Sequence, residues 1–89
     1  MISRQLDIIN KLGLHARAAS KFVKLAMGYD SEIRVRKGER EANGKSIMGL
    51  MMLAASCGTT IEVSVDGADE AEALAAIEDL LARRFDEGE

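Results

Sequence analysis

The sequence of 89 residues contains neither proline nor tryptophan, and it holds one cysteine, one histidine, one tyrosine and two phenylalanines. The single cysteine, Cys57, excludes an internal disulfide and indicates a reducing compartment. One histidine and one cysteine are too few to form a metal site alone, so we expect neither a metal nor an organic cofactor. So few rings argue against a protein that stacks nucleic-acid bases, and they require a core of aliphatic residues, alanine and methionine.

Long apolar segments are also missing. No run approaches the roughly 20 residues that a membrane span requires, and the first residues lack the pattern of a signal peptide. We therefore expect a cytoplasmic protein without membrane insertion. Hydrophobic residues make up 47% of the chain and charged residues 30%, which is the balance of a globular protein. The length predicts a single domain that covers residues 1–89.

Charge is unevenly distributed along the chain. Residues 1–65 contain ten basic and six acidic residues, whereas residues 66–89 contain two basic and nine acidic residues. The net charge is therefore +4 in the first part and −7 in the second, in agreement with −3 for the whole chain. A basic face on the first part suits a phosphate group or an acidic partner, although a solvated surface without a partner is the commoner explanation of such charges.

Hydrophobic periodicity predicts four strands and three helices in the order β-α-β-β-α-β-α. Interleaved elements of this length suit an α+β fold with one sheet and helices packed on one of its faces. The expected strands cover residues 2–9, 32–37, 39–43 and 60–66, and the expected helices cover residues 16–27, residues 46–55 and a long segment that starts near Asp69.

Particular residues are expected to begin and end these helices. Gly28 is suited to end the first helix, because glycine adopts the left-handed conformation without a steric cost. The Ser46 hydroxyl is suited to cap the second helix. Asp69 and Glu72 have the spacing of a capping box at the start of the third helix.

His15 lies directly before the first expected helix, after Gly13. The start of a helix presents backbone N–H groups without intrahelical partners and the positive end of the dipole, which together form a site for an anion. The same dipole disfavours a positive charge on the ring and so favours a neutral, nucleophilic imidazole. Its nitrogen can attack a phosphoryl group, and Arg17 can offer its guanidinium to the same phosphate. The alternative is a histidine that only caps the helix.

Ser46 has two candidate roles. As an N-cap it stabilises the second helix by about 1 kcal/mol. A phosphate added to Ser46 also lies at a helix N-terminus, and it brings about two negative charges to an apolar surface, which is enough to repel an acidic partner. The sequence favours the capping role.

The second helix is apolar on nearly all sides. A helix packed on one sheet buries one side, which we assign to Leu50 and Leu53. Methionine adapts to partners of several shapes, so the remaining side suits a docking surface for more than one partner. The alternative is that the methionines fill gaps in the core. The residues expected toward solvent are Ile47, Met48 and either Met51 or Met52.

Two separate motifs resemble a known family. Residues 11–19, KLGLHARAA, and residues 43–50, NGKSIMGL, resemble the HPr family of phosphocarriers in the bacterial phosphoenolpyruvate-dependent phosphotransferase system. The likeness covers essentially the whole chain, and the closing Phe85-Asp86-Glu87 is similar to the nitrogen branch of the family. One departure is Ala18, because the family usually has proline at this position of the first helical turn.

The resemblance implies an open-faced β-sandwich, in which four antiparallel strands carry three helices on one face. It implies that Enzyme I uses phosphoenolpyruvate to phosphorylate Nδ1 of His15, and that the carrier, itself not an enzyme, passes the phosphoryl group to a IIA-type acceptor. Arg17 matches the phosphate-stabilising arginine of the family. Ser46 matches the serine that a dedicated kinase, the HPr kinase/phosphorylase, modifies in many Gram-positive relatives. Ile47 and Met48 match hydrophobic docking contacts.

We expect a monomer that uses one docking surface for donor and acceptor, and hence weak and transient binding. Two other interpretations stay open. One is a regulatory binding module that acts through Ser46, Ile47 and Met48 without phosphoryl transfer, and the other is a ferredoxin-like ligand-sensing domain with the same order of elements. The sugar and nitrogen branches of the transfer system also both stay open. The residues assigned to the docking surface are Ala16, Ser20, Lys21, Lys24, Lys45, Ile47, Met48 and Met51.

Overall fold

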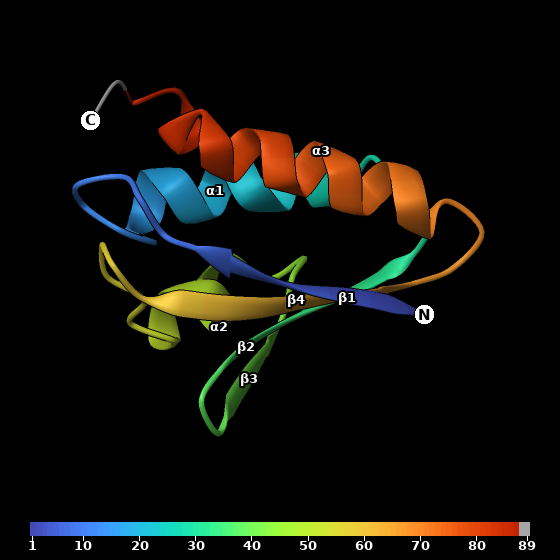
Figure 1. The fold of residues 1–89 in the computed structure, drawn as a ribbon, viewed down its shortest axis with the longest axis horizontal. Helices are drawn as coiled ribbons and strands as arrows, with labels where there is room; N and C mark the ends of the chain where they lie inside the picture. The colour runs from blue at the N-terminus through green and yellow to red at the C-terminus, as the bar shows by residue number, and fades with distance from the viewer. Residues whose placement is uncertain (88–89) are drawn as a thin grey trace.

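Four antiparallel strands form one sheet in the computed structural model, which describes residues 1–87. The elements are β1 (Ile2–Asp7), α1 (Ala16–Ala26), β2 (Glu32–Lys37), β3 (Arg40–Asn43), α2 (Ile47–Met52), β4 (Thr60–Asp66), α3 (Glu70–Ala82) and a short 3₁₀-type turn, η1 (Arg84–Asp86). The strands pair in the order β1-β4-β2-β3, so that β4 and β2 lie at the centre of the sheet (Figure 1).

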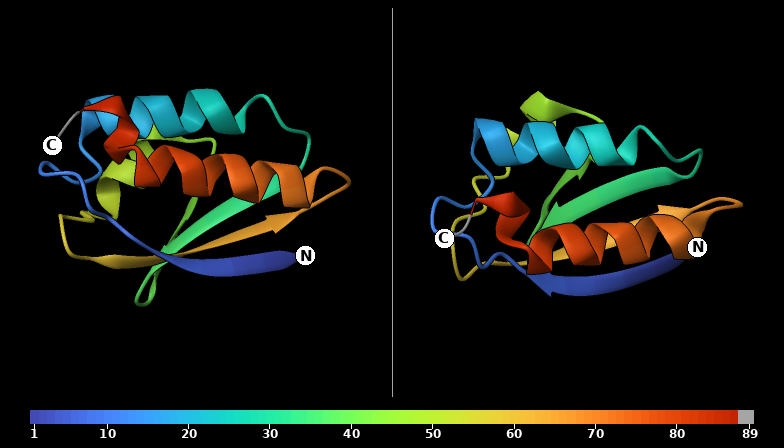
Figure 2. Two further views of the ribbon diagram at one scale, coloured as in Figure 1. Left: turned by 45° about the horizontal axis from the view of Figure 1, so that its top comes forward. Right: turned by 90° about the horizontal axis from the view of Figure 1, so that it is seen from above.

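The buried face of the sheet is built from alternating aliphatic side chains. Ile33 and Val35 of β2 and Ile61, Val63 and Val65 of β4 are at most 1% exposed, and the residues between them are exposed or half-buried. α1 and α3 lie side by side over the buried face, and α2 packs against α1 and β3 (Figures 1 and 2). The structure therefore confirms the predicted open-faced sheet with three helices on one face.

Aliphatic side chains, alanines and the two phenylalanines fill the space between the sheet and the helices. Phe22 and Phe85 are the largest side chains that are fully buried, and one apolar side of α1 and of α3 is buried as well. All five methionines, by contrast, are between 41% and 77% exposed. The expectation of methionine in the core is wrong, because the methionines lie on the outer side of α2 or at the ends of other elements, where the sheet does not cover them.

Several elements are shorter than the periodicity predicts. β1 and β3 cover two residues and one residue fewer than expected. α1 ends at residue 26 with Met27 as its C-cap in the right-handed conformation, and Gly28 does not adopt the left-handed conformation that we expected to end this helix. α2 ends at Met52, and Ala54 has a positive φ of 54°. Periodicity alone does not detect these local backbone changes.

The start of α3 is held by a contact that differs from the predicted capping box. Asp69 is the N-cap, but its carboxylate accepts hydrogen bonds from the backbone N–H groups of Asp30 (2.9 Å) and Ser31 (3.0 Å) and from the Ser31 hydroxyl. Gly67 is required beside this contact, since a Cβ there would lie 2.7 Å from Cα of Ser31. The Ser31 hydroxyl, followed by the Asp30 N–H, lowers the pKa of Asp69 below its ordinary value. The contact links α3 to the segment before β2.

The lowered pKa of Asp69 makes the stability of the fold depend on pH. A carboxylate whose pKa is depressed by folding stabilises the protein above the pKa of the unfolded chain, about 3.9, and this contribution is lost as pH falls through the folded value. We therefore expect Asp69→Asn to have a lower melting temperature than the wild type at about pH 7 and a shrinking difference below about pH 4. Thermal unfolding followed by circular dichroism between about pH 2 and 7 measures this, with Glu72→Gln in the same helical turn as the control. A difference that stays constant over this range would contradict the linkage.

The positive φ of Ala54 predicts a stabilising substitution. An alanine in the left-handed region costs roughly 1–2 kcal/mol, whereas glycine has no such cost but loses more freedom on folding. We expect Ala54→Gly to raise the free energy of unfolding by about 0.5–1 kcal/mol in urea titrations. Ala75→Gly, at an exposed position inside α3, is the matched control and should lower it by about 1 kcal/mol. Equal losses in both variants would show that residue 54 is unstrained.

Candidate functional site

His15 is the N-cap of α1, as the sequence predicts. Its backbone is extended (φ −78°, ψ −178°), and its carbonyl accepts the first helical hydrogen bond from the Ala19 N–H at 2.8 Å. Nδ1 of the ring faces the start of the helix and accepts a hydrogen bond from the Arg17 N–H at 3.4 Å. The side chain is 28% exposed, so solvent and a ligand can reach it. The ring therefore lies where the unpaired N–H groups of the first helical turn converge.

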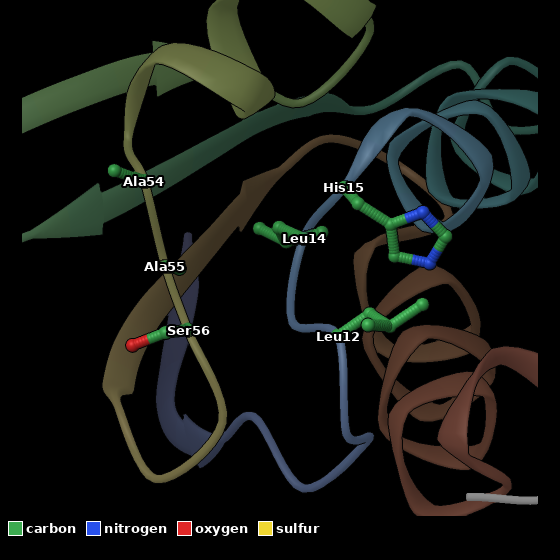
Figure 3. A pocket seen from close by; sticks show the side chains of 6 residues that line it. All are labelled: Leu12, Leu14, His15, Ala54, Ala55 and Ser56. Atoms are coloured by element: carbon green, nitrogen blue, oxygen red, sulfur yellow. The ribbon is translucent and has the colours of Figure 1, made fainter.

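The loop before His15 is packed closely against the segment that follows α2. The Leu14 N–H donates to the Ala55 carbonyl at 2.8 Å, and Leu14 is 4% exposed. Gly13 has a φ of +68°, and a Cβ at this position would lie 2.8 Å from Cα of Ser56, so only glycine fits. The two segments form a shallow pocket beside His15 (Figure 3), and its lining residues are Leu12, Leu14, His15, Ala54, Ala55 and Ser56.

Sequence reasoning missed a carboxylate that contacts the histidine ring. Oε2 of Glu87 lies within hydrogen-bonding distance of Nε2 of His15, 72 residues away, and Oε1 accepts a hydrogen bond from Nδ2 of Asn10 at 2.9 Å. The Glu87 side chain is 10% exposed. Burial acts to raise its pKa, but the hydrogen bonds from Asn10 and His15 and the nearby charge of Lys21 outweigh burial, so the pKa of Glu87 lies below its ordinary value. The two ring nitrogens thus face different environments.

A left-handed turn carries Glu87 to this position. Arg84, Phe85 and Asp86 have φ angles of 54°, 55° and 60°, and each such residue costs roughly 1–2 kcal/mol. Phe85 is 1% exposed, and burial of a phenylalanine side chain contributes about 1.5–3 kcal/mol. The Lys21 ammonium donates to the Phe85 carbonyl at 2.7 Å, and Arg83 donates to the Asp86 carboxylate at 2.7 and 2.8 Å. Burial of Phe85 and the Lys21 contact hold the turn against α1, whereas the Arg83–Asp86 pair is exposed on the surface of the turn.

The backbone N–H of Arg17 donates to the His15 ring, but the Arg17 side chain does not contact it. Its side chain is exposed, and among residues 1–87 its guanidinium makes no hydrogen bond or ion pair, so it is available to an incoming anion. The site therefore offers a ring nitrogen, the first N–H groups of α1 and, two residues further along, one exposed cation. This arrangement suits a negatively charged group such as phosphate.

α2 presents the apolar surface that the sequence predicts. Leu50 and Leu53 are 0% and 2% exposed, which confirms their assignment to the core. The residues exposed on the outer side are Ile47 (40%), Met48 (72%), Met51 (41%) and Met52 (70%). We expected either Met51 or Met52 toward solvent, and both are exposed. We call Ile47, Met48 and Met51 the α2 patch.

The three lysines that we assigned to the rim of the docking surface differ in their surroundings. Lys24 is exposed, and so are Ala16 and Ser20. Lys21 and Lys45 are half-buried and donate to main-chain carbonyls, Lys21 to Phe85 at 2.7 Å and Lys45 to Tyr29 at 2.8 Å. Lys21 and Lys45 therefore also fasten neighbouring segments, whereas Lys24 is exposed.

Ser46 caps α2, and Cys57 lies in a loop. The Ser46 hydroxyl accepts a hydrogen bond from the Gly49 N–H at 3.0 Å, which confirms the predicted cap of α2. Cys57 is exposed in the loop before β4. Within residues 1–87, no three histidine, cysteine or carboxylate side chains are grouped so that they could hold a metal ion. In the same range no helix has both the length and the apolar character that crossing a membrane requires.

Comparisons with known proteins find relatives that match nearly the whole chain. The family model PTS-HPr, described as the PTS HPr component phosphorylation site, matches residues 2–83. The phosphocarrier protein HPr of Neisseria meningitidis serogroup A is 57% identical over 89 residues and is covered completely, as is this chain. Two solved structures from Thermoanaerobacter tengcongensis are 44% identical. The one described as HPr-C-His has a TM-score of 0.94 with 98% of each chain covered, and the one described as an HPr dimer has a TM-score of 0.77 with 96% of this chain and 98% of the other covered.

Proposed function

The chain belongs to the PTS-HPr family, and from this premise we propose that it accepts a phosphoryl group from phospho-Enzyme I on Nδ1 of His15 and passes it to IIA-type proteins. The observation that carries this proposal is the position of Nδ1, which faces the first N–H groups of α1 on a half-exposed ring. We place this carrier in the cytoplasm and expect it to act as a monomer.

The geometry supports an in-line transfer at Nδ1. The lone pair of this nitrogen forms the bond to phosphorus as the bond between phosphorus and its donor breaks. The phosphate oxygens then meet the first N–H groups of α1, including that of Arg17, which faces Nδ1 at 3.4 Å in the unloaded site. The exposed guanidinium of Arg17 adds a charge-assisted contact to the same oxygens. Transfer to the acceptor is the same step in reverse.

The α2 patch suits both partners in turn. α2 packs against α1, of which His15 is the N-cap, and residues 54–56, which follow α2, line the pocket beside the ring, so a protein that reaches the ring also meets the segment that follows the patch. Exposed methionines adapt to differently shaped partners. An apolar patch of three side chains supports a small interface, and small interfaces release their partners quickly. Rapid release is what a carrier between two proteins requires.

Replacement of His15 tests the proposal. We expect the wild-type chain, incubated with Enzyme I and phosphoenolpyruvate, to gain one phosphoryl group that is acid-labile and base-stable, as phosphohistidine is. His15→Ala should gain none, whereas Ser46→Ala should be labelled like the wild type. Intact-protein mass spectrometry measures all three. Equal labelling of His15→Ala would refute the proposal, and a Ser46→Asp substitution that changes partner binding while His15→Ala changes nothing would favour the regulatory binding module.

A charge placed in the α2 patch tests the docking surface. Met48→Asp should lower kcat/KM for phosphorylation by Enzyme I about tenfold, because it replaces an apolar interface contact worth roughly 1–2 kcal/mol with a charge that must lose its water. Ala71→Asp, at an exposed position in the first turn of α3, introduces the same charge away from the patch and should leave kcat/KM unchanged. Equal values for Met48→Asp and the wild type would place the docking surface elsewhere.

A further inference from the structure

We propose that Glu87 is a positioning residue for His15, and that its carboxylate holds the proton on Nε2 while Nδ1 forms and later breaks its bond to phosphorus. This inference rests on the proposed phosphoryl transfer and adds a residue to it. The matched family model ends at residue 83, before the turn that carries Glu87. The C-terminal turn lies beside the start of α1, as both views in Figure 2 show.

The surroundings of Glu87 require its carboxylate to accept from two donors. Gly13 presents a carbonyl to Asn10 at 2.8 Å, and a carbonyl only accepts, so the amide nitrogen of Asn10 must face it. The second N–H of this amide then points to Oε1 of Glu87 at 2.9 Å. Oε2 remains for Nε2 of His15, which must carry the hydrogen in that contact. The network therefore selects the tautomer with the proton on Nε2 and the lone pair on Nδ1.

Two observations indicate that this network is maintained against a cost. Asn10 is fully buried, and its Oδ1 has no hydrogen-bond partner among residues 1–87, although buried polar atoms are nearly always paired. The three residues before Glu87 all have a positive φ, which residues other than glycine rarely adopt. Phe85 and the Lys21 ammonium on its carbonyl hold this turn in place. Strained backbone of this kind persists only where surrounding contacts hold it in place, and it is most frequent at functional sites.

The position of the proton matters in both directions of transfer. In loading, the lone pair of Nδ1 forms the bond to phosphorus, and the donor keeps the electron pair of the bond that breaks. Nε2 retains its proton, so the loaded ring of His15 is positively charged and lies against the Glu87 carboxylate. In unloading, the electron pair of the nitrogen–phosphorus bond returns to Nδ1, and the ring leaves as neutral imidazole rather than as an imidazolate anion. Neither step requires a proton to move.

The substitution Glu87→Gln tests this role with little change of shape. Glutamine replaces one of the two carboxylate oxygens by an NH₂ donor, so either Asn10 or His15 then faces a donor in place of its acceptor. Asp86→Asn is the matched control, because it neutralises the neighbouring carboxylate, which pairs with Arg83 in the same turn. Thermal unfolding of both variants checks that the fold is retained.

The first measurement is the tautomer of His15 in the ¹⁵N-labelled full chain, by long-range ¹H–¹⁵N correlation NMR. We expect the wild type and Asp86→Asn to show a single tautomer with the proton on Nε2. Glu87→Gln should show averaged nitrogen shifts from both tautomers. The same tautomer in all three proteins would overturn the proposal.

The second measurement uses phosphoramidate as a small phosphoryl donor, with ammonia as the leaving group, so that no docking surface is involved. ³¹P NMR should show phosphate on Nδ1 alone in the wild type and in Asp86→Asn. In Glu87→Gln, loading of Nδ1 should be about tenfold slower, and part of the phosphate should appear on the uncovered Nε2. Equal rates in the wild type and Glu87→Gln, or an equal loss in Asp86→Asn, would overturn the role of Glu87. Failure of Enzyme I to label the wild type would contradict only the proposed function.

Discussion

The close packing of residues 10–14 against the segment after α2 fixes the position of His15. The Leu14 N–H is bonded to the Ala55 carbonyl, and Gly13 leaves no room for a side chain between the two backbones. Because His15 follows directly, its extended backbone is set before α1 begins. A rotation of the loop would carry the ring away from the first N–H groups of the helix. The anion-binding geometry therefore depends on a contact between two loops more than on the helix itself.

Backbone strain in the described part of the chain is gathered around this contact. The non-glycine residues with a positive φ among residues 1–87 are Ala54, Arg84, Phe85 and Asp86. Ala54 lines the pocket beside His15, and the other three form the turn that brings Glu87 to the ring. The regular strands and α-helices among residues 1–87 contain no such residue, since they bury their apolar faces without strain. The fold thus concentrates its unfavourable backbone conformations where side chains must be held in one place.

Local patterns in the sequence were sufficient to predict the elements and part of the site. Alternation in β2 and β4 and helical spacing in α1 and α3 determine which side chains are buried, and both depend on neighbours a few residues apart. The placement of His15 at a helix start is equally local. Ser46 caps α2 for the same reason, because a cap needs only the next three residues.

The remainder depends on contacts between distant residues, which leave no local signal. Glu87 meets His15 across 72 residues and Asn10 across 77, and Asp69 meets Ser31 across 38. The spacing of Asp69 and Glu72 predicted a capping box that does not form, because the Asp69 carboxylate accepts hydrogen bonds from Asp30 and Ser31 instead. The methionine prediction failed for a related reason. Composition gives the number of apolar side chains but not which of them the sheet covers.

A phosphoryl carrier must satisfy two opposing requirements at one ring. Its nitrogen must be nucleophilic enough to take phosphorus from one protein, and the product must be labile enough to give it to another. In this site the Arg17 N–H at the start of α1 lies on the side of Nδ1, where it would meet phosphate oxygens in the proposed transfer, and the Glu87 carboxylate lies on the side of Nε2. Donors on one side and an acceptor on the other polarise the ring along the same direction in the empty and the loaded state. Under the proposed transfer Nε2 keeps its proton in both states, so neither loading nor unloading requires a proton to move, and the direction of transfer is left to the partners.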